Sequence, residues 1–198
     1  APDSATAEGR GVASSAAPLV LGEPGHVRIL TDDDGPFTAR LNFLAGDPAT
    51  GDGIDTTWVL SRASGLAAAG WSGKGELVLT AEPGDYTLVV HRGIRHEAHT
   101  QPVTVTAGGE VLVQADLAEA YSHDGWLLAD PHSHASPSPD GEISMEDRLL
   151  VQTASGVQVH FGTDHDHLAD YRPLVASLGL VDQLVSVVSD EVSPPLRG

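Results

Sequence analysis

Hydrophobic and polar residues alternate with a period of two through most of the chain between residues 19 and 117. Such alternation is typical of strands that bury one face. Turn-forming residues separate the alternating segments, for example at 82–85 and 107–109. The strands expected from this pattern cover 26–30, 38–43, 76–79, 86–90, 103–105 and 111–113. Short strands at this spacing predict an antiparallel β-sandwich over residues 18–119, preceded by a flexible leader at 1–17.

After residue 120 the pattern changes to strands that alternate with helices. Apolar runs predict buried strands at 125–129, 157–161 and 184–188. Helices are expected at 145–154 and 168–178. The first would begin at a capping box formed by Ser144 and Asp147, and glycines would end both. This order of elements predicts the first part of an α/β barrel over residues 120–198, with its site at the carboxyl ends of the strands.

Composition narrows the possible partners and the chemistry. The formal net charge of −18 argues against binding of nucleic acid or anionic membranes, since both attract basic patches. The chain has no cysteine, which excludes disulfides and thiolate metal sites. No apolar stretch is long enough for membrane insertion. The small, polar residues at the start resemble what remains after a signal peptide is removed, so we expect export to the periplasm or the cell exterior.

Side chains that can bind metal follow each expected strand of the second half. Asp130-Pro131-His132-Ser133-His134 follows the first, Thr163-Asp164-His165-Asp166-His167 the second, and Ser189-Asp190-Glu191 the third. Imidazole and carboxylate are ligands that zinc, iron and manganese accept. Because the carboxyl ends of parallel strands meet at one edge, we predict a divalent metal site there. His160, inside the second strand, is instead expected to be packed and hydrogen-bonded.

The segment 125–194 resembles the PHP (polymerase and histidinol phosphatase) family of metallohydrolases in three motifs. These are Asp-x-His-x-His with a later Asp, matched by Asp130, His132, His134 and Asp140; Thr-Asp-His, matched by Thr163, Asp164 and His165; and a glutamate after the third strand, matched by Glu191. With a sandwich in front, the layout is similar to the carbaryl-hydrolase-like branch. In that branch a carboxypeptidase-regulatory-like β domain precedes a PHP barrel.

The resemblance implies two or three divalent ions, and zinc, iron and manganese all remain open. It implies that His132 and His134 hold one ion, that Asp140 and His165 hold another, and that Glu191 bridges two. Asp130 and Asp164 would orient imidazoles, and His167 would contact either substrate or solvent. The chain departs from the family at Pro131, which replaces an apolar residue, and in the proline-rich loop 136–139.

The resemblance also implies a hydrolase that cleaves a phosphoester, amide or carbamate bond of a small molecule. Its nucleophile would be a metal-bound hydroxide, with no protein nucleophile. The family's later ligands do not follow Glu191. We therefore expect a second polypeptide, the C-terminal fragment of the same precursor, to complete the barrel; truncation or accidental proteolysis near Arg197 is the alternative. The alternative function is a non-catalytic binding protein with a degenerate PHP scaffold.

Overall fold

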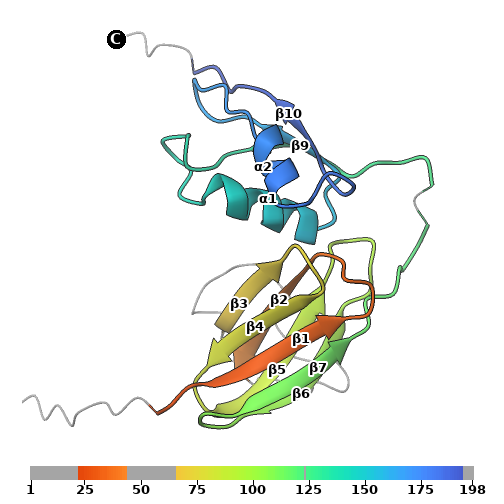
Figure 1. Ribbon diagram of the computed structural model, residues 1–198, viewed down its shortest axis with the longest axis vertical. Helices are drawn as coiled ribbons and strands as arrows, with labels where there is room; N and C mark the ends of the chain where they lie inside the picture. The colour runs from red at the N-terminus through yellow and green to blue at the C-terminus, as the bar shows by residue number, and fades with distance from the viewer. Residues whose placement is uncertain (1–21, 44–65, 123, 194–198) are drawn as a thin grey trace, which may run out of the picture.

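The computed structural model describes residues 22–43, 66–122 and 124–193, so the expected leader at 1–17 lies outside the described residues. The described residues contain ten strands in three small sheets and two helices (Figure 1). The elements are β1 (Gly25–Thr31), β2 (Phe37–Phe43), β3 (Leu66–Ser72), β4 (Glu76–Ala81), β5 (Gly84–His91), β6 (His99–Val105), β7 (Glu110–Ala115), β8 (Ala129–Ser133), α1 (Met145–Ala154), β9 (Val159–Gly162), α2 (Arg172–Ser177) and β10 (Val185–Val188). Neither helix is long and apolar enough to cross a membrane.

Strands β1 to β7 form two sheets that share one apolar core. The sheet orders are β4-β1-β7 and β3-β2-β5-β6. Strand β1 shows why the alternation in the sequence worked as a signal, because Val27 and Ile29 are buried and the residues between them are partly exposed. Tyr86 and Phe37 are the largest fully buried side chains of this core. Its hydrophobic surface is the main stabilising feature of this half of the chain.

The strand directions correct the expectation of a purely antiparallel arrangement. β1 pairs with β4 in antiparallel orientation, but it pairs with β7 in parallel orientation, with Val27 opposite Val111. A parallel pair requires a long connection between its strands, and here the remaining strands of the sandwich supply it. Strand β3, which the alternation did not predict, pairs with β2 at the edge of the larger sheet.

The residues after 124 form a small open unit, so the expected α/β barrel is wrong. Its sheet has three parallel strands in the order β10-β9-β8, and only the two helices accompany it. A barrel requires a sheet that closes on itself, whereas these three short strands leave two edges within the described residues. Strand, helix and strand in succession are common to open sheets and barrels, and the sequence pattern did not separate them.

One predicted strand and one predicted helix of this unit also differ from expectation. The predicted strand at 125–129 is wrong, because Trp126 and Leu127 are 78% and 68% exposed and β8 begins only at Ala129. Helix α2 begins at Arg172 instead of residue 168, with Pro173 in its first turn. The prediction for α1 is confirmed over Met145–Ala154.

Helix α1 lies between the parallel sheet and the sandwich (Figure 1). Its serine cap is as expected, since Ser144 Oγ accepts a hydrogen bond from the amide of Asp147. At the other end, Gly93 of the sandwich lies so close to Ser155 that a Cβ on this glycine would be 1.8 Å from the Ser155 carbonyl oxygen. The C-terminal end of α1 therefore rests directly on the sandwich backbone.

Candidate metal centre

The three predicted ligand segments meet at the carboxyl edge of the parallel sheet. His132 is on β8 and His134 directly follows it, His165 follows β9, and Glu191 follows β10. An isolated parallel bridge between His165 and Glu191 extends the pairing of β9 and β10 past the strand ends. Parallel pairing thus brings side chains that are distant in sequence to one place.

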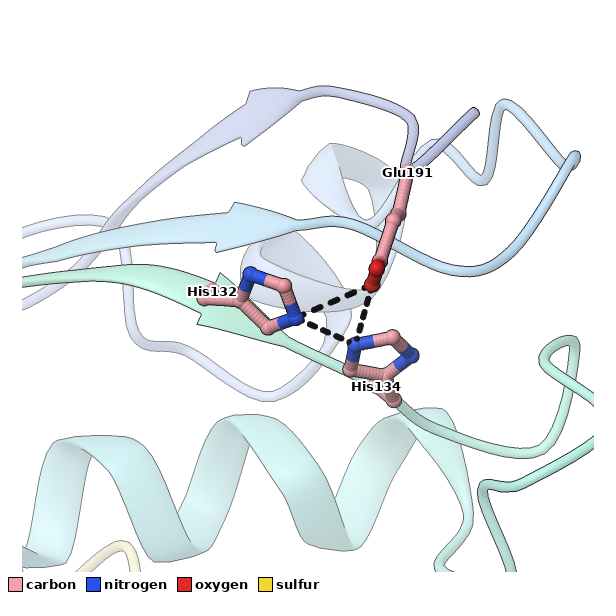
Figure 2. Close-up of side chains that lie close together, drawn as sticks. All are labelled: His132, His134 and Glu191. Atoms are coloured by element: carbon pink, nitrogen blue, oxygen red, sulfur yellow. Dashed lines mark hydrogen bonds and ion pairs between the residues drawn. The ribbon is translucent and has the colours of Figure 1, made fainter. Parts of the chain in front are cut away.

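His132, His134 and Glu191 form the first group of possible metal ligands (Figure 2). Nε2 of His132 and Nε2 of His134 each lie 3.0 Å from Oε2 of Glu191. The two Nε2 atoms are 2.8 Å apart. Figure 2 shows the three side chains pointing toward one another from separate segments. Three potential ligand atoms therefore converge on one small volume.

The spacing and burial of these atoms fit a divalent cation. Glu191 Oε2 is shielded from solvent and makes no hydrogen bond within the described residues; its polar neighbours are the two imidazole Nε2 atoms. A buried carboxylate oxygen without a donor is unfavourable unless a cation compensates it. Two ligands at right angles on an ion bound at about 2.1 Å lie about 3.0 Å apart, and tetrahedral ligands lie about 3.4 Å apart. The observed separations of 2.8–3.0 Å are therefore short enough for His132, His134 and Glu191 to hold one divalent ion together.

The second group consists of His134, Asp140 and His165. Asp140 Oδ1 lies 3.2 Å from His134 Nδ1, and Asp140 Oδ2 lies 3.5 Å from His165 Nε2. Oε2 of Glu191 is also 3.7 Å from His165 Nε2. The glutamate therefore lies between imidazoles of the two other segments, and a carboxylate in this position could be shared by two ions.

Hydrogen bonding keeps Asp140 ionised beside these imidazoles. The hydroxyl of Ser138 donates to Asp140 Oδ1 over 2.6 Å. This bond, followed in importance by the positive potential of His134 and His165, lowers the pKa of the Asp140 carboxyl. The side chain of Asp140 is 58% exposed and that of His132 is 61% exposed. The cluster therefore opens to solvent on this side. A substrate could reach the cluster from there.

The carboxylates of Asp130 and Asp164 contact backbone amides and neutral side chains instead of imidazoles. Asp164 is fully buried and accepts hydrogen bonds from the amide of Ala135 at 2.8 Å and from the hydroxyl of Tyr171 at 2.7 Å. Burial, and after it the bond to Asp164, raises the pKa of the Tyr171 phenol, so this hydroxyl remains a donor. Asp164 thereby ties the loop after His134 to the loop after β9.

Asp130 supports the other side of the first histidine pair. Its Oδ1 accepts a hydrogen bond from the amide of His132 at 3.2 Å, and its Oδ2 accepts one from Gln152 of α1 at 2.5 Å. Arg148, also on α1, donates to the carbonyl oxygen of His134 at 2.7 Å. Helix α1 therefore fixes the backbone segment that contains His132 and His134.

His167 lies outside both ligand groups. Its side chain is exposed, and its amide donates to Asp190 Oδ1 at 3.1 Å. Three side chains that support the ligands, Ser138, Tyr171 and Ser193, were not predicted from the sequence. Ser193 Oγ lies 2.9 Å from His165 Nδ1. Serine and tyrosine carry no spacing signature of such a role, so only the fold could reveal them.

Beneath the cluster, a buried polar chain crosses the three parallel strands. His160 of β9 lies 3.0 Å from Ser186 Oγ of β10 and 3.3 Å from Ser133 Oγ of β8. The edge of its ring faces Tyr171, with the ring centres 4.9 Å apart. Burial lowers the pKa of His160 to about 4, so it is neutral at pH 7. The expectation of a packed, hydrogen-bonded imidazole is confirmed.

The chain matches no protein-family model, and a search of curated proteins gives no match. The chemistry of the cluster is therefore argued from its own residues. It contains histidine, aspartate and glutamate groups that could hold a metal ion.

Proposed function

We propose that this chain carries the metal centre of a metal-dependent hydrolase of the PHP type. The observation that carries the proposal is the environment of Glu191 Oε2, a solvent-shielded carboxylate oxygen that makes no hydrogen bond within the described residues and faces the Nε2 atoms of His132 and His134. A polar atom left in this state costs about 1–3 kcal/mol in stability. Unsatisfied buried polar groups in native proteins often have a functional role, and a bound cation would compensate the charge of this oxygen.

Each ligand residue has a defined task in the proposed centre. His132, His134 and Glu191 hold the first ion, while Asp140 and His165 share Glu191 with a second. A bound divalent ion supplies two kinds of chemistry, since it lowers the pKa of a coordinated water and polarises the oxygen of a scissile ester, amide or phosphoryl group. The exposed face beside His132 and Asp140 admits the substrate.

The attacking group that suits this cluster is a water molecule. The described residues near the cluster offer no cysteine, and the carboxylates and imidazoles already contact one another. Attack by an activated water therefore suits the site better than a covalent intermediate on the protein. Phosphoesters, amides and carbamates of small molecules are the substrates that we propose, with zinc, iron or manganese as the ion.

We also propose that a second polypeptide contributes to the finished site. Leu168, Val185 and Val192 are large apolar side chains that are 60% or more exposed in the same unit as the cluster. The edges of the three-stranded sheet, which are unpaired within the described residues, are surfaces that another chain can cover, and these side chains would add apolar area to such a contact. Such a partner could add ligands to an ion that the three atoms of the first group leave incompletely coordinated.

The experiment combines metal analysis with a hydrolysis screen. The purified protein is loaded with manganese, zinc or ferrous iron, and the bound metal is measured by mass spectrometry after gel filtration. Chromogenic phosphoesters, carbamates and anilides serve as substrates. We expect bound metal in the wild-type chain, turnover when its partner polypeptide is present, and loss of both in His132→Ala and Glu191→Ala. His26→Ala is the matched control, because His26 lies on β1 and bonds to Thr80, away from the cluster.

Two results would refute parts of this proposal. Unchanged turnover in His132→Ala and Glu191→Ala would refute the assigned site. A protein that binds no stoichiometric metal, and whose properties do not change when a chelator is added, would instead be a non-catalytic binding protein. The control variant separates these outcomes from a general loss of folding.

A further inference from the structure

Ser138 is a buried hydroxyl at the centre of the second ligand group. Only 3% of the residue is exposed. Its backbone is fixed in a turn, since its amide donates to the carbonyl of Ala135 and its carbonyl accepts from the amide of Gly141. A Cβ on Gly141 would lie 2.0 Å from the Ala135 carbonyl oxygen, so the turn requires glycine there. The loop therefore holds the Ser138 hydroxyl in one place.

Three groups surround Ser138 Oγ. Oδ1 of Asp140 is 2.6 Å away, Nδ1 of His134 is 3.1 Å away, and the amide nitrogen of His165 is 3.2 Å away. A serine hydroxyl has one proton to donate and two lone pairs to accept with. The number of neighbours thus equals the number of hydrogen bonds that the hydroxyl can make.

The direction of each bond follows from the chemistry of the partners. The Ser138 hydroxyl donates its proton to Asp140 Oδ1. The amide of His165 only donates, so it occupies one lone pair. His134 Nδ1 must then donate to the remaining lone pair, and this requires a proton on Nδ1. Asp140 Oδ1, 3.2 Å from Nδ1, favours the same proton position.

We propose that Ser138 is a positioning residue that fixes His134 in the Nδ1–H tautomer. A neutral imidazole with its proton on Nδ1 has its free lone pair on Nε2. Nε2 is the atom that faces His132 and Glu191. His134 is therefore a ligand of the first ion only, and its contact with Asp140 is a hydrogen bond. The inference rests on the proposed metal centre for its functional meaning, but the tautomer itself does not depend on it.

The tautomer is tested directly in the metal-free protein. Histidine is labelled with ¹⁵N, and long-range proton–nitrogen correlation spectra report which ring nitrogen carries the proton. His134→Gln assigns the signal. We expect the Nδ1–H form in the wild-type protein and a shift toward the Nε2–H form in Ser138→Ala. Ser136→Ala is the matched control, because Ser136 is an exposed serine of the same loop.

Metal affinity gives a second readout on the same variants. Loss of a side chain that orients a ligand typically costs about 10- to 100-fold in metal affinity. We expect that loss for manganese in Ser138→Ala, measured by competition with a chelator, wild-type affinity in Ser136→Ala, and partial recovery in Ser138→Thr, which restores the hydroxyl. Circular dichroism checks that each variant is folded.

The outcomes separate this inference from the proposed function. An Nε2–H tautomer of His134 in the wild-type protein overturns the inference, whether or not metal binds. An unchanged tautomer together with unchanged affinity in folded Ser138→Ala overturns the role of Ser138. A wild-type protein with the Nδ1–H tautomer and no metal binding supports the hydrogen-bond assignment and overturns the metal centre.

Discussion

Oε2 of Glu191 lies 3.0 Å from Nε2 of His134, although the two residues follow different strands, β10 and β8. Strand β9 separates them in the sheet. The contact exists only when all three strands are paired, so the ligand group and the fold of this unit depend on each other. A bound ion would stabilise the folded state, because the unfolded chain has no preformed group of this kind.

The first prediction is that metal stabilises the protein through Glu191. At a free metal concentration about 100 times the dissociation constant, the gain in the free energy of unfolding is about 2.7 kcal/mol. Thermal unfolding with manganese or zinc and with a chelator measures it. Glu191→Gln should show no gain, while Glu142→Gln, a change at an exposed glutamate outside both ligand groups, should respond like the wild type. Equal gains in both variants would argue against the site.

The second prediction concerns the hydrogen bond between Tyr171 and Asp164. Tyr171→Phe removes one of the two donors that satisfy this buried carboxylate. We expect the free energy of unfolding to fall by about 1–3 kcal/mol, measured by urea denaturation. Tyr121→Phe changes an exposed tyrosine and should have almost no effect. A similar small effect in both variants would show that Asp164 does not depend on this bond.

The third prediction concerns the space beside Gly162. A Cβ at this glycine would lie 2.4 Å from Cε2 of Tyr171, whose ring is fully buried. Gly162→Ala should therefore displace the ring, destabilise the fold by about 1–3 kcal/mol and weaken metal binding through Asp164. Gly22→Ala, where the nearest atoms are 3.9 Å away, is the control. Wild-type stability and metal affinity in Gly162→Ala would contradict the packing described.

The fourth prediction is a pH dependence that His160 causes. Its pKa is about 4 in the folded protein and close to 6.5 in the unfolded chain, so the unfolded chain binds the additional proton first as the pH falls. The contribution is present above pH 6.5 and is lost toward pH 4. Between pH 7 and pH 5 the loss is about 2 kcal/mol.

The measurement compares urea denaturation of the wild type and His160→Gln at both pH values. Glutamine keeps hydrogen-bonding capacity toward Ser186 and Ser133 but does not titrate. The variant should lose about 2 kcal/mol less on acidification than the wild type does. If acidification costs both proteins the same free energy, His160 does not titrate as described.

Local signals in the sequence predicted local structure well. Ser144 and Gly156 bracket α1 because a serine cap and a glycine with positive φ satisfy helix ends wherever they occur. Helix α2 was predicted too long. Pro173 suits the first turn of a helix, and the apolar residues before it, Ala169 and Tyr171, belong to the core without being helical. The run at 125–129 failed as a strand because hydrophobicity alone does not show what covers Trp126.

The architecture was harder to predict than its elements. β8 contains Asp130, Pro131 and His132, which are poor strand residues, and its parallel pairing with β9 gives it a strand conformation that propensity does not favour. Whether parallel strands close into a barrel or stay open depends on pairing across the whole sheet, which no short motif encodes. The expectation of a barrel failed for this reason.

The candidate ligands could be predicted because histidine and carboxylate carry their chemistry in the residue type. The groups that support them could not, since Ser138 and Tyr171 act through positions that only the folded chain defines. The sharing of Glu191 between imidazoles from two other segments likewise appears only when β8, β9 and β10 lie side by side.

The most direct test of the account is an anomalous-difference map from crystals of the protein loaded with manganese, recorded at a wavelength where the metal scatters anomalously. The account predicts a peak about 2 Å from His132 Nε2, His134 Nε2 and Glu191 Oε2. A second peak between Asp140 and His165 would accompany it if two ions bind. Fully loaded crystals with no peak at these atoms, or with the metal bound elsewhere, would contradict the central claim.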